Sequence, residues 1–206
     1  MNITKLELGL LKSNCYLISS EKAAICIDPG YYDERIRLFF EENSDKQRMI
    51  LLTHTHFDHV GAAERLRSET GVKIAIGRIE EPSLHDPAVT LSDRFHAHIA
   101  PFGADKMIDD GEEFSVGDLK ISAILTPGHT IGGMCYLING NLFSGDTLFA
   151  GTIGNTTHPG GDGDRLLRSL EQLAYMLPDE TPVYPGHGKS TDMGTEKRTN
   201  PFLREL

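Results

Sequence analysis

Residues 54–59 of the chain read HTHFDH and gather three histidines and an aspartate within six positions. They follow a continuous apolar run, which is typical of a strand buried on both faces. In an extended segment that leaves a strand, residues two apart point the same way, so His54 and His56 could bind one ion. Asp58 and His59 would then stand at the start of a helix beside the same strand end. This corner could therefore supply half of each of two adjacent metal sites.

A single histidine is more often a satisfied core or surface residue than a metal ligand. The pattern H-x-H-x-D-H changes that balance, because it would arise by chance in roughly one of a thousand chains of this composition. The sequence offers further ligands in matching contexts, since each follows an apolar strand that ends in a glycine-containing stretch. They are His129 in TPGHT, Asp146 in FSGDT and His187 in VYPGHG. This repeated arrangement predicts that the side chains converge at one edge of the fold.

The elements that would position these residues begin with a strand-rich first half. A helix at 33–43 would have Asp33 as its N-cap, and a helix at 60–71 would have Gly71 at its C′ position. Residues 77–106 are a polar, proline-containing insertion to which the pattern assigns no structure. The strands expected in this half are 1–10, 15–19, 23–28, 49–53 and 73–76.

The second half repeats the order of strands followed by a helix. Its helical pattern spans 164–177, with Asp164 near the cap and Pro178 as the stop. A tight turn at 139–141 would connect two of the strands. The strand-like runs expected in this half are 118–125, 134–140, 142–145 and 181–185. Two such halves predict an α/β sandwich with the helices on the outside.

Composition limits the kind of partner. We expect one domain over residues 1–206, which carries 20 basic and 30 acidic side chains and a net charge of −10. The chain has no basic run, so a nucleic-acid partner is not expected. No run reaches the roughly 18 apolar residues of a membrane-spanning helix. We therefore expect a small-molecule substrate and no membrane partner, and the oligomeric state stays open.

The three cysteines, Cys15, Cys26 and Cys135, stand in apolar surroundings and form no C-x-x-C pair. Buried free thiols are their expected state, which fits a reducing compartment. The N-terminus has no apolar stretch behind a basic start, so it does not resemble a secretory signal. These observations together predict a cytoplasmic protein.

The combined motifs resemble those of the metallo-β-lactamase superfamily, in its glyoxalase II-like branch of single-domain, hydroxyacylglutathione hydrolase-like enzymes. The resemblance runs from IDPG at 27–30 to NPF at 200–202. It implies a four-layer αββα metallo-β-lactamase sandwich with two metal ions between the edges of its sheets. In that pattern one ion is held by His54, His56 and His129, the other is held by Asp58, His59 and His187, and Asp146 bridges the two.

Five imidazoles and two carboxylates suit zinc first, and also iron or manganese. Two divalent cations leave such a centre positive even after both aspartates and a hydroxide are counted, which favours hydroxide at neutral pH and stabilises an oxyanion. We therefore expect a metal-dependent hydrolase in which a hydroxide bridging the ions attacks a carbonyl carbon and Asp58 orients that hydroxide. A thioester suits this chemistry because a thiolate leaves without a strong general acid.

The sequence departs from the glyoxalase II-like pattern in features that would affect substrate binding. We expect a single domain without the helical C-terminal domain that binds glutathione in full-length glyoxalase II-like enzymes. Asn155 and Thr157 replace the basic and the aromatic or acidic residues that relatives carry after GDTLF. A glutathione thioester is thus less expected than another thioester. Two alternatives stay open: a mononuclear iron persulfide dioxygenase using His54, His129 and Asp146, and a hydrolase of another ester or a lactone.

Several residues near the motifs keep two interpretations. Asp28, in IDPG, could orient a ligating histidine or form a local Asx turn. His96 and His98 form a second H-x-H without a further ligand motif nearby, so surface or loop positions are favoured over the substrate cleft. His158 follows Asp146 by 12 positions and could face the pocket or make a loop contact.

Overall fold

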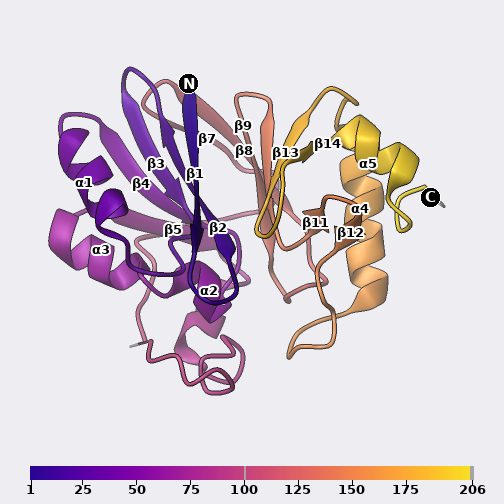
Figure 1. Cartoon of the computed structure of the whole chain (residues 1–206), viewed down its shortest axis with the longest axis horizontal. Helices are drawn as coiled ribbons and strands as arrows, with labels where there is room; N and C mark the ends of the chain where they lie inside the picture. Colours follow the sequence, from indigo (N-terminus) through magenta and orange to yellow (C-terminus); the bar gives the residue numbers. More distant parts are fainter. Residues whose placement is uncertain (100, 205–206) are drawn as a thin grey trace.

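The computed structural model describes residues 1–99 and 101–204 of the chain. Two six-stranded sheets lie face to face, and helices cover the outer face of each sheet (Figure 1). The first half of the chain forms one sheet with its helices, and the second half forms the other. The predicted four-layer αββα sandwich is confirmed.

The first sheet is antiparallel between its first three strands and parallel from the third strand onward. Two helices cross over between its parallel strands, α1 (Glu34–Glu42) and α3 (Ala63–Thr70). Asp33 caps α1 as expected, because its side chain accepts a hydrogen bond from the Arg35 amide. The strands in spatial order are β1 (Asn2–Leu8), β2 (Ser13–Ser19), β3 (Ala23–Ile27), β4 (Gln47–Leu52), β5 (Lys73–Gly77) and β6 (Lys106–Ile108).

The helix expected at 60–71 is wrong in its first part, because two helices stand there. A short helix, α2 (Phe57–Val60), precedes α3, and the chain breaks between them at Gly61. The Ala62 amide donates to the Pro29 carbonyl at 2.9 Å, so the loop after β3 interrupts the helical hydrogen bonds. A Cβ on Gly61 would lie 2.4 Å from the Gly30 carbonyl oxygen. The predicted end at Gly71 is confirmed by its left-handed φ of 70°.

The second sheet is mixed, with a parallel pairing between β10 and β13. The predicted tight turn is confirmed, since Asn139 and Gly140 both have positive φ between β9 and β10. A two-stranded hairpin follows β10, made of β11 (Leu148–Phe149) and β12 (Thr152–Ile153). The strands in spatial order are β14 (Thr191–Asp192), β13 (Pro182–Pro185), β10 (Asn141–Gly145), β9 (Met134–Ile138), β8 (Leu119–Leu125) and β7 (Glu113–Val116).

Two helices cover this second sheet, α4 (Gly163–Met176) and α5 (Met193–Thr199). The cap of α4 is Asp162, whose side chain accepts from the Arg165 amide, whereas the expected Asp164 lies within the first turn. The sequence patterns missed β6, β7, β11, β12, β14 and α5, which are two to seven residues long. Elements this short give too few repeats of an apolar period to be recognised.

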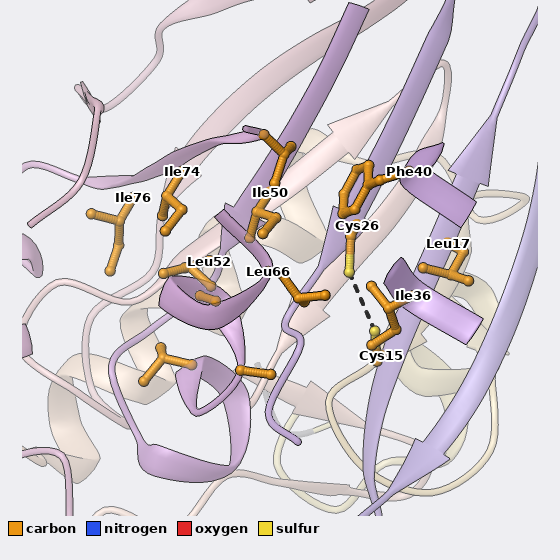
Figure 2. Packing of buried hydrophobic residues seen from close by; sticks show 14 of the residues in the cluster. Cys15, Leu17, Cys26, Ile36, Phe40, Ile50, Leu52, Leu66, Ile74 and Ile76 are labelled. Atoms are coloured by element: carbon orange, nitrogen blue, oxygen red, sulfur yellow. Dashed lines mark hydrogen bonds between the residues drawn. The ribbon is translucent and has the colours of Figure 1, made fainter. Parts of the chain in front are cut away.

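Three hydrophobic cores fill the three spaces between the four layers. On β3, Cys26 faces the helices while Ile25 and Ile27 face the opposite sheet, as the alternation of a strand requires. Helices α1 and α3 are shorter than the roughly 12–15 residues that an isolated helix needs. Packing of Phe40 and Leu66 onto the first sheet therefore stabilises them (Figure 2).

All three cysteines are buried free thiols, as expected. The Sγ atoms of Cys15 and Cys26 lie 3.4 Å apart in the core beneath α1 (Figure 2). In its described residues, 77–99 and 101–106, the insertion contains one 3-10 turn, η1 (Glu81–His85), and its loops lie next to α2 (Figure 1). Within residues 1–99 and 101–204, no helix is both long enough and apolar enough to span a bilayer.

Candidate metal centre

The structure brings all seven predicted side chains together at one edge of the sandwich. Residues 54–59 leave the end of β4 in the first sheet. His129, Asp146 and His187 follow the ends of β8, β10 and β13 in the second sheet. Strand ends from both sheets meet here, so residues far apart in the chain become neighbours, as the repeated strand-and-turn context predicted.

Three of the histidines form what we call the histidine group: His54, His56 and His129. One nitrogen of each ring lies within 4.8 Å of the others. The closest approach joins His129 Nε2 to His56 Nδ1, at 2.9 Å. All three side chains are buried, and His54 Nε2 has no hydrogen-bond partner in the described part of the chain.

The other three residues form the acidic group: Asp58, His59 and His187. Asp58 Oδ2 lies 3.3 Å from His187 Nε2 and 3.6 Å from His59 Nε2. The two imidazole Nε2 atoms are 3.4 Å apart. His187 is the most accessible member, with 27% of its side chain exposed, whereas His59 is fully buried.

Asp146 lies between the two groups and faces both of them. Its Oδ2 is 3.5 Å from His129 Nε2 and 3.5 Å from His187 Nε2, while its Oδ1 is 3.4 Å from His59 Nε2. Gly186 allows this approach, because a Cβ there would lie only 2.1 Å from Asp146 Oδ1. The geometry therefore fits the predicted bridging position.

Contacts outside the centre fix the orientation of four of the five rings. His59 Nδ1 contacts Asp28 Oδ2 at 2.9 Å, and His129 Nδ1 contacts the Asn155 carbonyl at 2.7 Å. His187 Nδ1 similarly contacts the Leu11 carbonyl at 3.1 Å. Because these oxygens accept the Nδ1 proton, each ring turns its Nε2 toward the centre, which is the usual arrangement around a metal ligand.

His54 is oriented through an intermediate hydroxyl. Thr53 donates its hydroxyl proton to Asp28 Oδ2 at 2.6 Å, so its oxygen accepts from His54 Nδ1 at 3.0 Å. Asp28 Oδ1 also accepts from the Thr53 amide. Asp28 thus orients one histidine directly and another through Thr53, which matches the first of its two interpretations.

Glu80 is a positioning residue that the sequence analysis missed. Its buried carboxylate accepts from the Thr55 amide and hydroxyl at 3.1 and 2.9 Å, between His54 and His56. It also accepts from the Gly132 amide at 2.8 Å, in the loop that carries His129. Burial raises the pKa of Glu80. The only available signal was its place after the apolar strand β5, which is the context shared by the predicted ligands.

The His187 turn is tied to the start of the chain. Asn14 Nδ2 donates to the Pro185 carbonyl at 2.8 Å, and the Tyr16 hydroxyl donates to the same oxygen at 2.6 Å. The Asn14 amide donates to the Gly186 carbonyl at 2.7 Å. Strand β2 of the first sheet therefore holds the loop after β13 of the second sheet.

The two groups differ in their electrostatics. Burial lowers the pKa values of His54, His56 and His129, so these rings are neutral near pH 7. Burial also acts to lower the pKa of His59, but the nearby carboxylates, Asp146 first among them, outweigh it and raise that pKa to about 10. For Asp58, burial acts to raise the pKa, and the facing histidines outweigh it and lower the pKa.

The arrangement fits a pair of divalent cations. Two ligand atoms about 2.1 Å from one tetrahedral ion lie about 3.4 Å apart. The distances from Asp146 and Asp58 to the facing imidazoles, 3.3–3.6 Å, match that value. Within the described residues, the buried His54 Nε2 and Asp146 Oδ1 have no hydrogen-bond partner, and a cation would supply one for each to bind. The ligand roles of the seven residues stay a prediction that this geometry supports.

A cleft of about 180 Å³ opens onto the centre. His158 lines it, and its ring centroid lies 5.6 Å from that of His56, so the pocket-facing interpretation of His158 is confirmed. His96 and His98 are exposed and do not line the cleft, in agreement with the surface interpretation.

Comparison with known proteins gives a consistent result. A family model described as the Metallo-beta-lactamase superfamily matches residues 8–187. The chain is 36% identical over 208 residues to the hydroxyacylglutathione hydrolase GloC of Haemophilus influenzae, with 98% of each chain covered.

Solved structures agree in fold. The structure of BLEG-1, described as a B3 metallo-beta-lactamase, gives a TM-score of 0.88 at 33% identity and covers 98% of this chain and 99% of its own. The structure of TTHA1623 in a di-iron-bound form gives a TM-score of 0.84 at 32% identity and covers 97% and 100% respectively.

Proposed function

The chain belongs to the metallo-beta-lactamase superfamily, and we propose that it is a dinuclear, metal-dependent hydrolase that cleaves thioesters. The observation that carries this proposal is the position of Asp146, which faces both the histidine group and the acidic group within 3.5 Å. A carboxylate placed in this way could bridge two ions. The ligands we propose are the seven residues named from the sequence.

The identity of the ions follows from the donor atoms. Five imidazoles and two carboxylates suit zinc, and the same set accepts iron or manganese. The di-iron form of TTHA1623 supports a site for two ions and keeps iron as an alternative to zinc. When bound, such cations would polarise a carbonyl group and lower the pKa of water to about 7.

The residues of the chain would divide the remaining tasks. Asp58 stays ionised because its pKa is lowered, so its carboxylate could accept a hydrogen bond from water and orient it toward a carbonyl carbon. Asp28 and the carbonyls of Leu11 and Asn155 hold the facing imidazoles in one tautomer.

The leaving group favours a thioester over an amide. A thiol has a pKa of about 8.5, so a thiolate leaves without being protonated, whereas an amide nitrogen needs a proton. The ionised Asp58 is suited to accept a proton and not to donate one. The similarity to the thioesterase GloC supports the same class. The similarity to BLEG-1 makes β-lactam hydrolysis the second candidate.

The test is to load the purified protein with zinc and to measure its metal content and the hydrolysis of a thioester panel and a chromogenic cephalosporin. We expect two zinc ions per chain and faster cleavage of thioesters than of the cephalosporin. Preferential cleavage of the cephalosporin would select the second candidate. A single iron per chain with oxygen uptake on a persulfide would overturn the hydrolase proposal.

Three further expectations accompany this proposal. We propose that residues 1–206 act as one domain, supported by the continuous match over residues 8–187. A small molecule is the expected substrate, since the cleft holds about 180 Å³. The three buried free thiols support a reducing compartment such as the cytoplasm.

A further inference from the structure

Two of the loops that line the cleft differ in the polarity of their side chains. The loop after η1 contributes Leu91 and Phe95, which lie beside Phe57 of α2. The loop after β12 contributes Asn155 and His158. The wall formed by Leu91 and Phe95 is therefore apolar and partly aromatic, whereas Asn155 and His158 are polar, and Leu11 and Phe149 also line the cleft.

Phe95 extends an apolar surface from the metal centre to the solvent. Its ring stacks on Phe57, with centroids 4.9 Å apart and an interplanar angle of 30°. Phe57 is buried and stands between His56 and Asp58 in the sequence, whereas Phe95 is 44% exposed. The guanidinium of Arg94 lies 5.9 Å from the Phe95 ring centroid. The Phe95 ring thus lies at the entrance of the cleft and packs on Phe57, which belongs to the HTHFDH segment.

Leu91 is held in an unfavourable backbone conformation at the same wall. Its φ is 61°, although it is a bulky residue with a Cβ, and its side chain is 94% buried against the cleft. The Phe57 amide donates to the neighbouring Thr90 carbonyl at 2.8 Å and anchors this loop to α2. Backbone strain of this kind persists mainly at ligand-binding and catalytic positions.

We propose that the acyl group of the substrate carries an aromatic ring, which packs against Phe95 and Leu91 while the thioester carbonyl reaches the metal centre. This inference rests on the proposed thioester hydrolysis. Among the described residues that line the cleft, none is a lysine or arginine that could pair with a carboxylate on the acyl group, so an uncharged ring suits this wall better. A cleft of about 180 Å³ accommodates one ring.

The reaction balances without any additional reagent. The oxygen of water bonds to the carbonyl carbon of the arylacyl thioester, and the carbon–sulfur bond breaks. The sulfur leaves with the electron pair as a thiolate. The products are an arylalkanoate and a thiol, together with the proton that water loses.

The experiment compares two substrates that share one thiol, S-phenylacetyl- and S-acetyl-N-acetylcysteamine, on the zinc-loaded protein. We expect kcat/KM to be at least about tenfold higher for the phenylacetyl thioester, in line with burial of an apolar group in an enzyme pocket. Phe95→Ala should lower the ratio of the kcat/KM values for the phenylacetyl and acetyl thioesters about tenfold. Phe95→Leu should keep part of the preference, because it retains apolar contact.

Phe202→Ala is the matched control, since Phe202 is 41% exposed and lies outside the residues that line the cleft. It should leave both substrates unchanged. Equal kcat/KM values for the two thioesters, with no effect of Phe95→Ala, would overturn the aromatic preference and leave thioester hydrolysis standing.

A binding measurement separates this inference from the proposed function. We expect phenylacetate to bind the zinc-loaded protein about tenfold more tightly than acetate in calorimetric titrations, and Phe95→Ala to abolish the difference. If neither thioester is cleaved but this binding difference is present, thioester hydrolysis fails and the aromatic site stands. Equal binding of the two acids by the wild-type protein would overturn the aromatic site.

Discussion

The histidine group and the acidic group lie side by side but hold their side chains by different means. His54 and His129 are neutral and buried, and their rings are fixed because their Nδ1 atoms donate hydrogen bonds to the Thr53 hydroxyl and the Asn155 carbonyl. The rings of the acidic group also have outside hydrogen bonds, from His59 to Asp28 and from His187 to the Leu11 carbonyl, but charge attraction is added to them. Nearby carboxylates, Asp146 first among them, outweigh the effect of burial and raise the pKa of His59 to about 10. An ion that binds the histidine group would find unprotonated ring nitrogens, whereas an ion that binds the acidic group would have to displace a proton from His59.

This difference has a general lesson for a paired site. Neutral ligands fixed by outside hydrogen bonds are organised before any ion arrives, so their geometry depends on the surrounding loops. Charged ligands organise one another, so removing one member disturbs the rest of its group. The two halves of the centre should therefore respond to different substitutions.

Asp146→Ala should have the largest effect of the three substitutions, because it should weaken ion binding at both groups. Because Asp146 faces both, we expect both ions to bind more than about 100-fold more weakly, beyond the range for residues that only orient ligands. Elemental analysis and competition with a zinc chelator would measure this. Asp45→Ala, at an exposed position, is the control. Retention of two tightly bound ions would contradict the bridging role.

His187→Ala should separate the groups by weakening only one of them. Its side chain is 27% exposed and faces Asp58 and Asp146, so the fold should tolerate the change while the acidic group loses a ligand. We expect about one ion per chain at chelator concentrations where the wild-type protein keeps two. His98→Ala is the control, since His98 is exposed and lies outside the cleft. Loss of both ions together would show that the two groups are not independent.

Glu80→Gln should have the smallest effect of the three substitutions on ion binding. It should act on the histidine group and not on the acidic group. The amide would keep an acceptor for Thr55 but would turn a donor toward the Gly132 amide, so the loops carrying His56 and His129 would shift slightly. We expect about tenfold weaker binding at the histidine group. Calorimetric zinc titration would measure it, with Glu81→Gln as the control. Weaker zinc binding at the acidic group, with unchanged zinc binding at the histidine group, would refute the positioning role of Glu80.

The fold class and the convergence of the seven residues could be predicted from the sequence because each residue follows an apolar strand. Each strand ends at the edge of its sheet. The HTHFDH segment and the turns before His129 and His187 follow strand ends, so they lie at the same edge of the sandwich. Asp146 was found by the same reasoning. Patterns of this kind are local, and the resemblance to a known family supplied how the ligands divide between two ions.

The contacts that orient the ligands could not be predicted, because they depend on distances through space. Glu80 stands 25 positions from Thr55, and the oxygens that accept from His129 and His187 belong to the backbone of Asn155 and Leu11. Backbone oxygens are present at every position and leave no trace in the sequence. The break of the helix at Gly61 likewise results from the loop after β3, which lies against it.

The tie between β2 and the His187 turn has a consequence for biosynthesis. The bond from Asn14 to the Pro185 carbonyl joins residues 171 positions apart, and the one from His187 to Leu11 spans 176. Synthesis runs from the N-terminus, so the first sheet and its HTHFDH corner emerge from the ribosome long before the last ligand exists. The nascent chain can therefore complete the proposed two-ion centre only after His187 has been synthesised, which restricts full metal loading to chains that extend past this residue.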